Sequence, residues 1–311
     1  MFRIDAGKTP EYCDGHSRRS FLQFGMTGAG VLSLPSILRA RTASGQSSRD
    51  TSVILIWLDG GPSQHDTYDP KPEAPREYAG IWNPIRTTVP GMDISEMFPR
   101  QAKIAEHFSL LRSVHHRSGD HFTGGHWMLT GRGGVSGAMN AGKFPFVGSI
   151  ATKLCGPRQP GMPPNVAIPY AMSIGLRPGY FGGNYLGVQN DPFQTESDPN
   201  SANFQVRNLN PSSGITIDRL ENRRELQGQF DRLRREVDQS GMINAMDRFG
   251  IQAFEMVAGA KARAAFDIST EDPRLRDRYG RNTWGQSALL ARRLVEAGTT
   301  FVSCHFGGWD S

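Results

Sequence analysis

The feature that most constrains the fold is an unbroken run of six apolar residues, Val53–Leu58, rich in β-branched types. A run this short and this apolar indicates a β-strand buried on both faces, as in parallel sheets. It stops at Asp59, and Gly60-Gly61-Pro62 follows, through which no strand continues. Ligands of open parallel α/β sheets bind outside the carboxyl ends of the strands, so Asp59 is a candidate for chemistry. A turn or cap role is the simpler alternative.

The composition favours a soluble globular protein and argues against nucleic-acid binding. The chain has 311 residues, 37% of them hydrophobic, and no apolar stretch long enough to span a membrane. Its net charge is +5, but residues 1–45 hold six basic and three acidic residues, which leaves +2 for residues 46–311. The basic character therefore belongs largely to the N-terminus. The three cysteines form no C-x-x-C pair, so no zinc knuckle or redox motif is present.

The first 45 residues match a twin-arginine signal peptide. Ser17-Arg18-Arg19-Ser20-Phe21-Leu22 carries the paired arginines, and a mildly apolar segment follows as far as Leu38. Ala43-Ser44-Gly45 offers small residues at the positions that a signal peptidase reads, so cleavage before Gln46 is expected. The alternative is the basic start of a cytosolic helix. We expect export of an already folded protein by the twin-arginine machinery, to the periplasm or as a secreted protein.

A second candidate strand, Phe108–Val114, is followed by a cluster of histidines. A helix expected from Ser95 to about His107 would join the two strands into a βαβ unit, which indicates a parallel sheet. Five of the eight histidines lie within twenty residues: His107, His115, His116, His121 and His126. If the fold gathers them near Asp59, imidazole and carboxylate ligands together suit zinc, manganese or iron. Histidines that hold turns in a solvated loop are the alternative.

The rest of the chain predicts a single α/β domain over residues 46–311. The expected elements are helices at 121–129, 146–154 and 283–297, strands at 166–168 and 299–305, a loop-rich insertion about 174–211 and a helical hairpin about 216–265. Asp310 follows the carboxyl end of the strand expected at 299–305, as Asp59 follows the carboxyl end of the first strand. Because Asp310 is the next-to-last residue, we expect the chain to be the N-terminal part of a longer domain.

The order of the motifs resembles the DUF1501 family of exported bacterial proteins, which is similar to the sulfatases and the alkaline-phosphatase superfamily. The motifs are the export signal, LDGGPSQHDTYDPKP, SGDHFTGGHWMLTGR, RDRYG, GQSALLARRLVEAG and FGGWD, and they cover nearly the whole chain. The resemblance implies a mostly parallel central sheet with helices on both faces. It also implies two metal ions at the strand ends and a Ser, Thr or formylglycine nucleophile that attacks a phosphate or sulfate ester.

Matched residue by residue, the resemblance makes Asp59 the first metal-binding Asp and Asp310 the Asp of a later motif. Leu129-Thr130-Gly131-Arg132 matches the end of the nucleophile helix of sulfatases. Counting back from it places the nucleophile position near His121, with Thr123 as a substitute if the helix register shifts. The C-x-P-S-R motif of formylglycine sulfatases is absent.

The resulting hypothesis is an exported metal-dependent hydrolase of phosphate or sulfate esters, including those of sulfated or phosphorylated carbohydrates. The expected metal ligands, for zinc or manganese, are Asp59, His65, His126 and Asp310. The expected catalytic residues are His121, Thr123 and Arg132, with Arg132 steadying the anionic substrate or the helix end. A non-catalytic exported protein that binds metal or carbohydrate on the same scaffold is the alternative, and a structural component without metal is a third possibility.

Overall fold

The computed structural model describes residues 51–133, 144–173, 175–206 and 260–309. The chain divides into two units, residues 1–51 and 52–311, and all of the described residues except Thr51 belong to the second. The expected signal peptide at 1–45 lies outside the described residues, as do Asp310 and most of the expected hairpin at 216–265. No described helix combines the length and the apolar character that crossing a membrane requires.

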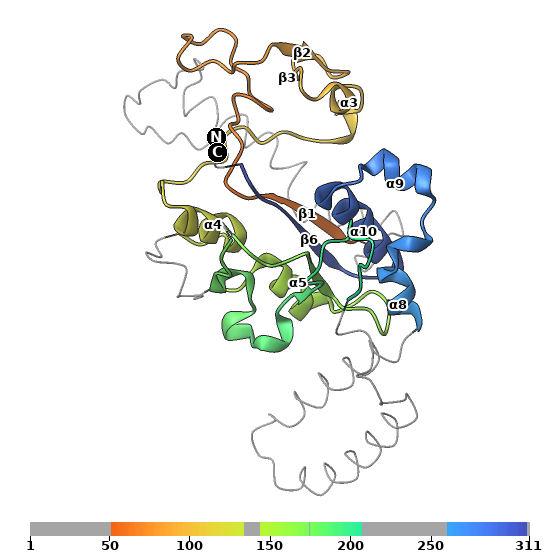
Figure 1. The fold of residues 1–311 in the computed structure, drawn as a ribbon. Helices are drawn as coiled ribbons and strands as arrows, with labels where there is room; N and C mark the ends of the chain where they lie inside the picture. The colour runs from red at the N-terminus through yellow and green to blue at the C-terminus, as the bar shows by residue number, and fades with distance from the viewer. Residues whose placement is uncertain (1–50, 134–143, 174, 207–259, 310–311) are drawn as a thin grey trace, which may run out of the picture. The chain divides into compact units, whose positions relative to one another are not determined.

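The centre of the second unit is a parallel sheet of four strands in the order β1-β6-β4-β5 (Figure 1). The strands are β1 (Val53–Leu58), β6 (Phe301–Phe306), β4 (Asn165–Ile168) and β5 (Phe193–Gln194). β1 pairs with β6 from Val53↔Phe301 to Leu58↔Phe306, so the two strands end level with each other. The expectation of an α/β fold with a mostly parallel sheet is confirmed.

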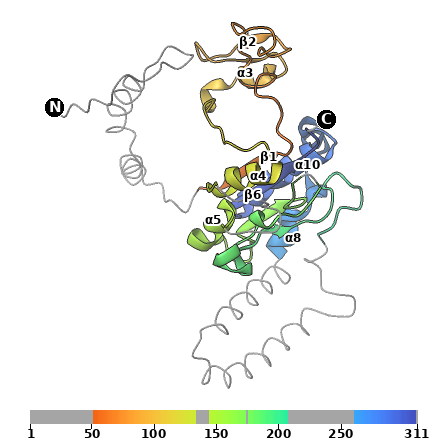
Figure 2. The ribbon, with the colours of Figure 1, turned by 90° about the vertical axis from the view of Figure 1, so that its left-hand side faces the viewer.

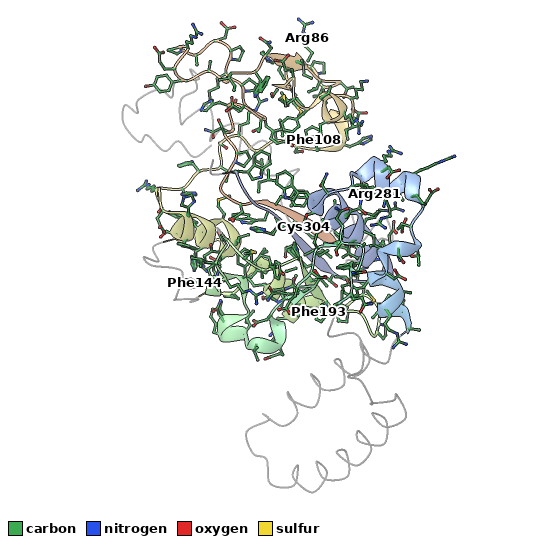
Figure 3. All side chains as sticks on the ribbon, in the orientation of Figure 1. Arg86, Phe108, Phe144, Phe193, Arg281 and Cys304 are labelled. Carbon is green, nitrogen blue, oxygen red and sulfur yellow. The ribbon has the colours of Figure 1, made fainter. Side chains whose placement is uncertain are left out.

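Helices cover both faces of this sheet because alternate side chains of its strands point to opposite faces. One face packs on α8 (Ala260–Phe266) and α10 (Thr283–Ala297) through four buried strand residues, Val166, Ile168, Val302 and Cys304. The other packs on α4 (His121–Thr130) and α5 (Val147–Cys155) through Ala167 and Phe301. Figure 2 shows the two sets of helices around β6, and Figure 3 labels Cys304 in the interior between them.

The remaining elements are short. They are β2 (Pro84–Arg86), β3 (Asp93–Ser95), α3 (Pro99–Ala102), α9 (Pro273–Tyr279) and five 3-10 turns: η2 (Ala105–His107), η3 (Gly179–Phe181), η4 (Asn184–Leu186), η5 (Val188–Asn190) and η7 (Ile268–Thr270). β2 and β3 form an antiparallel hairpin across a turn in which Gly91 adopts a φ of 79°, a conformation that favours glycine. The expected insertion, described for residues 175–206, consists of short turns together with β5, an edge strand of the central sheet.

The prediction that β1 is buried on both faces is wrong. Among the described strands, β1 pairs only with β6, and it therefore forms one edge of the described sheet. Three of its side chains, Val53, Ile54 and Ile56, are 38–45% exposed. An apolar run is shared by interior strands and by apolar edge strands, so the sequence pattern did not distinguish them.

The segment between the first strand and the histidine cluster also differs from expectation. The single helix expected from Ser95 to His107 is wrong: Ser95 ends β3, and Pro99 starts a separate one-turn helix, α3. Residues 108–114 form no strand, and Leu111 is 78% exposed. The parallel partner of β1 comes from β6, far along the chain, so these residues do not complete the expected βαβ unit.

Candidate functional site

Asp59 sits at the carboxyl end of β1, where the sequence pattern placed it. Its backbone N–H donates to the carbonyl of Phe306 over 3.0 Å, so the ladder between β1 and β6 extends one residue past β1. Gly60 and Gly61, with φ of 93° and 73°, then turn the chain away through backbone conformations that residues with a side chain rarely adopt. The Asp59 residue is only 4% exposed. A carboxylate this buried needs partners, because burial of an unpaired charge is costly.

The hydrogen bonds of the Asp59 carboxylate include contacts with Trp57, Ser173 and His305. Trp57 Nε1 and Ser173 Oγ donate to Oδ1 over 3.1 and 2.7 Å. His305 Nε2 lies 3.1 Å from Oδ2. Because an ionised carboxylate only accepts hydrogen bonds, His305 carries its proton on Nε2 in this contact. The site thus joins the end of β1 to the end of β6 and to the segment after β4.

The chain beyond β6 folds back over the same strand end. The backbone N–H of Trp309 reaches the carbonyl of Asp59 over 3.4 Å. The Trp309 ring stacks on Trp284 of α10, with ring centres 5.4 Å apart, and Trp284 stacks in turn on Phe306 at 5.5 Å. These aromatic contacts hold the FGGW segment against α10 and keep His305 in register with Asp59.

The N-terminus of α4 lies near the carboxyl end of β1. Asp120 caps the helix by accepting the N–H of Thr123 at Oδ2 over 2.7 Å, and Gly131, with a φ of 69°, ends it. The hydroxyl of Thr123, and then its N–H, lower the pKa of Asp120. Thr123 therefore serves in the cap of this helix.

Two glycines let other groups approach α4 closely. A Cβ on Gly124 would lie 2.9 Å from the His116 ring, and one on Gly125 would lie 2.8 Å from the hydroxyl oxygen of Tyr180. Both distances are shorter than real side chains allow, so a side chain at either position would force the His116 ring or the buried Tyr180 ring to shift.

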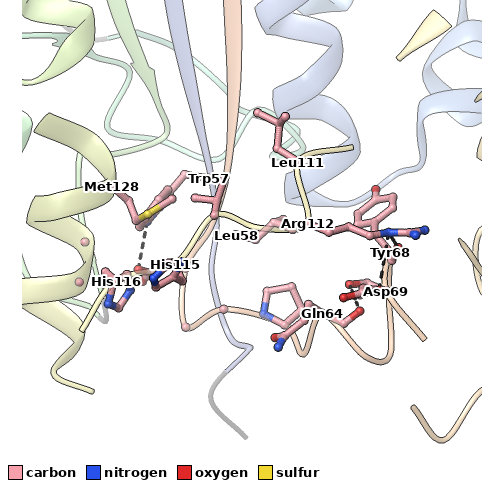
Figure 4. A pocket seen from close by; sticks show the side chains of 18 of the residues that line it. Trp57, Leu58, Gln64, Tyr68, Asp69, Leu111, Arg112, His115, His116 and Met128 are labelled. Atoms are coloured by element: carbon pink, nitrogen blue, oxygen red, sulfur yellow. Dashed lines mark hydrogen bonds and ion pairs between the residues drawn. The ribbon is translucent and has the colours of Figure 1, made fainter. Parts of the chain in front are cut away.

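A pocket of about 1010 Å³ lies over the carboxyl end of β1 (Figure 4). Its wall includes Asp59, Ser173, the glycine pair of α4 and the histidines His115, His116 and His121. Figure 4 shows His115 and His116 beside Met128 of α4, and on another side Arg112 with Tyr68 and Asp69. Arg112 is anchored there by hydrogen bonds to the carbonyls of Tyr68 and Asp93, at 2.9 and 2.6 Å. The pocket is therefore lined by histidines on one side and by an arginine–carboxylate pair on the other.

Of the expected site residues, Asp59 and His121 line the pocket and others lie elsewhere. His126 is 1% exposed and points into the core: its Nδ1 lies 2.9 Å from the carbonyl of Arg132, and its ring packs edge-to-face on Tyr180. The Arg132 guanidinium lies over the Phe144 ring. His65 lies in the loop after β1, with Nε2 3.3 Å from the Gln64 amide nitrogen.

A metal site needs several His, Cys, Asp or Glu side chains that converge on one point. Among the described residues no three His, Cys, Asp or Glu side chains converge on one point. Asp59 and His305 converge as a pair, with 3.1 Å between Oδ2 and Nε2. Two ligands of one tetrahedral zinc, with bonds of about 2.0–2.1 Å, lie about 3.3 Å apart. The 3.1 Å between Oδ2 and Nε2 is also the length of their hydrogen bond, so among the described residues the pair could supply two ligands only once Nε2 has given up its proton.

Two residues of this site, His305 and Ser173, were missed in the sequence. His305 lies within the strand expected at 299–305, which the structure places at Phe301–Phe306, and it is the residue of β6 paired with Trp57. An imidazole near the end of a parallel strand next to β1 was a usable signal. Ser173 lies in a turn after β4, closed by paired hydrogen bonds between the backbones of Ser173 and Leu176 at 2.8 and 2.9 Å. No sequence pattern marks such a turn.

Comparison with known proteins places the chain in a family. A family model described as a protein of unknown function (DUF1501) matches residues 50–311. No curated protein and no solved structure matches the chain.

Proposed function

We propose that the chain, which belongs to the DUF1501 family of proteins of unknown function, is an exported metal-dependent hydrolase of phosphate or sulfate esters. One observation carries the proposal. A buried carboxylate, Asp59, meets an imidazole, His305, at adjacent strand ends, and Asp59 lines a pocket of about 1010 Å³. A pocket of this size admits more than a bare phosphate or sulfate, in keeping with an ester of a sugar or another organic alcohol.

Asp59 and His305 would hold the metal, which is zinc or manganese. Carboxylate oxygen and imidazole nitrogen are ligands that both ions accept. When bound, the metal would supply Lewis-acid polarisation of the ester oxygens. Trp57 and Ser173, which donate to Oδ1, leave Oδ2 directed towards His305 and so orient the carboxylate.

The N-terminus of α4 would receive the anionic group of the substrate at those of its first N–H groups that the Asp120 cap leaves available. The first N–H groups and the dipole of a helix favour negative charge at that end. Three histidines of the pocket wall, His115, His116 and His121, add N–H donors or bases beside it. His121 is the first residue of α4 and stands where the resemblance places the nucleophile, so an imidazole would act there as nucleophile or as proton carrier.

The direct test is hydrolysis by the 311-residue protein of 4-nitrophenyl phosphate and 4-nitrophenyl sulfate, with and without added zinc or manganese. The proposal expects metal-dependent turnover that is abolished by Asp59→Ala and reduced by His121→Ala. Turnover that Asp59→Ala leaves unchanged would contradict it.

A second candidate is an exported protein that binds metal or carbohydrate without turnover. The residue at the nucleophile position favours it, because His121 replaces the Ser, Cys or Thr of known ester hydrolases of this kind. Metal binding that depends on Asp59, combined with no hydrolysis of either ester, would select this candidate. No bound metal and no hydrolysis would leave the purely structural role.

The proposed export has its own test. Arg18→Lys with Arg19→Lys keeps the charge but removes the paired arginines that the twin-arginine machinery reads. The double variant is expected to stay in the cytoplasm, and export equal to that of the wild-type protein would overturn the assignment.

A further inference from the structure

Tyr180 buries a phenol hydroxyl next to the proposed metal site. The residue is 0% exposed, and its ring packs edge-to-face on His126, with ring centres 6.0 Å apart. Within the part of the chain that the structure describes, its hydroxyl has no hydrogen-bond partner of ordinary distance and angle. A buried hydroxyl left this way destabilises the folded protein. Phenylalanine would fill the same space without that penalty, so the hydroxyl needs an explanation.

The Tyr180 hydroxyl lies next to Gly125, a residue of the pocket wall. It lies where a Cβ on Gly125 would be only 2.8 Å away, and Gly125 lines the pocket. Burial raises the pKa of Tyr180 to about 12, while Ser173 lies near enough to lower it by hydrogen bonding and the charges of Asp59 and Asp120 raise it further. The phenol therefore keeps its proton at neutral pH and is able to donate it to a neighbouring acceptor.

The direction of hydrogen bonding at this point is fixed by chemistry. The ionised Asp59 carboxylate accepts only, so the Ser173 hydroxyl must donate its single proton to Oδ1, 2.7 Å away. Ser173 Oγ then has lone pairs left and no proton to give. The neighbouring group that can satisfy it is the O–H of Tyr180.

We propose that Tyr180 is a positioning residue that donates to Ser173, and through Ser173 to Asp59, in a relay that fixes the carboxylate for binding a divalent cation. The inference rests on the proposed function, since the cation is the one assigned to Asp59 and His305. A small approach of the two hydroxyls completes the relay. Each hydrogen bond in such a chain polarises the next, so the Tyr180 proton strengthens the hold of Ser173 on Oδ1 and keeps Oδ2 directed towards His305 and the cation.

The first test is the affinity of the purified 311-residue protein for zinc and for manganese, measured by isothermal titration calorimetry. Tyr180→Phe is expected to weaken binding about 10-fold, the usual effect of losing a group that orients a metal ligand. The matched control is Tyr170→Phe, which also removes a phenol hydroxyl, here one bonded to the carbonyl of Glu196 over 2.8 Å at an exposed position. Equal affinities for wild type, Tyr180→Phe and Tyr170→Phe would overturn the relay.

The second test is independent of metal and separates failure of the relay from failure of the proposed function. Melting temperatures are compared for wild type, Tyr180→Phe, Ser173→Ala and the double variant, all without metal. A relay predicts that Tyr180→Phe lowers the melting temperature and that this loss disappears in the Ser173→Ala background. If the Tyr180 hydroxyl is buried without a hydrogen-bonding role, Tyr180→Phe leaves the melting temperature unchanged or raises it. The effects of Tyr180→Phe and Ser173→Ala then add in the double variant, and that result overturns the relay. If the cycle shows coupling but wild type binds neither metal, the hydroxyl contact stands, and both the cation role of the relay and the proposed metal site fail.

Discussion

His305 Nε2 lies 3.1 Å from Oδ2 of Asp59, so one hydrogen bond joins the carboxyl ends of β6 and β1. The two residues are 246 positions apart in sequence, and the parallel register Leu58↔Phe306 brings them together. The pair links residues near the start of the described chain to residues near its end, and the proposed chemistry depends on it.

The cap of α4 predicts a pH-dependent loss of stability. Asp120→Ala removes the acceptor of the Thr123 N–H and is expected to lower the melting temperature, whereas Asp120→Asn keeps a capping side chain and should lower it less. The Thr123 hydroxyl and N–H lower the pKa of Asp120, so its contribution is present above the ordinary Asp pKa and is lost as the pH falls through the lowered value.

Melting curves of the three proteins at neutral and at acidic pH check this prediction. The gap between wild type and Asp120→Ala should narrow at acidic pH. A gap that is independent of pH would show that the charge of Asp120 plays no part in the cap.

The contact between Gly125 and Tyr180 predicts a strong effect of adding one methyl group. Gly125→Ala places a Cβ 2.8 Å from the hydroxyl oxygen and 3.2 Å from Cζ of Tyr180, so the ring or α4 must shift. We expect destabilisation of about 1–3 kcal/mol, the usual range for overpacking, reduced by the better helix propensity of alanine. Urea unfolding measures it. Gly119→Ala is the control, because a Cβ there meets nothing within 4 Å, and equal stability of the two variants would contradict the packing described.

The two described cysteines should differ in reactivity. Cys155 is exposed and Cys304 is buried, and burial raises the pKa of the Cys304 thiol from 9.0 to about 12. Because the thiolate is the reactive form, a thiol reagent should label Cys155 in the folded protein and Cys304 only after unfolding. Mass spectrometry of the labelled peptides is the measurement, and rapid labelling of Cys304 in the native protein would contradict its position under α10.

The raised pKa of Cys304 also predicts how the free energy of unfolding changes at alkaline pH. Its stabilising contribution is complete below the unfolded-state pKa and is lost as the pH rises from about 9 towards 12, because only the unfolded state ionises there. Cys304→Ala lacks this group, so its free energy of unfolding should fall less than that of wild type between neutral pH and about pH 10. An identical fall in both proteins would show that the thiol does not titrate differently in the two states.

Local signals in the sequence predicted several elements closely. The amphipathic stripe and Gly298 predicted the helix at 283–297, which is α10 at the same bounds, and Gly298 ends it with a φ of 115°. The helix expected at 121–129 is α4, one residue longer, and the strand expected at 166–168 is β4. For the two helices, short-range periodicity and a glycine end signal determine the element, and for β4 a short apolar run before Pro169 does, so no distant contact is needed to predict them.

Pairing between segments far apart in the sequence explains most of the differences between the predicted and the observed structure. The partner of β1 is β6 rather than residues 108–114, and no local pattern records which strands become neighbours. Asp59 was predicted because a turn signal follows it directly, whereas the approach of His305 to Asp59 depends on the register of β6 with β1, which no local pattern records. His126 shares the helical face that packs on Tyr180, and its burial there depends on a segment more than fifty residues later in the chain.

The central claim is that Asp59 and His305 together bind a divalent cation, and metal affinity tests it most directly. Zinc and manganese binding to the 311-residue protein should be measured for wild type, Asp59→Asn, His305→Gln and the control His107→Gln, a histidine exposed beside Glu106. The account predicts binding by wild type and by His107→Gln, and a loss of at least about 10-fold in both Asp59→Asn and His305→Gln. Equal binding by all four proteins, or no binding by wild type, would contradict it.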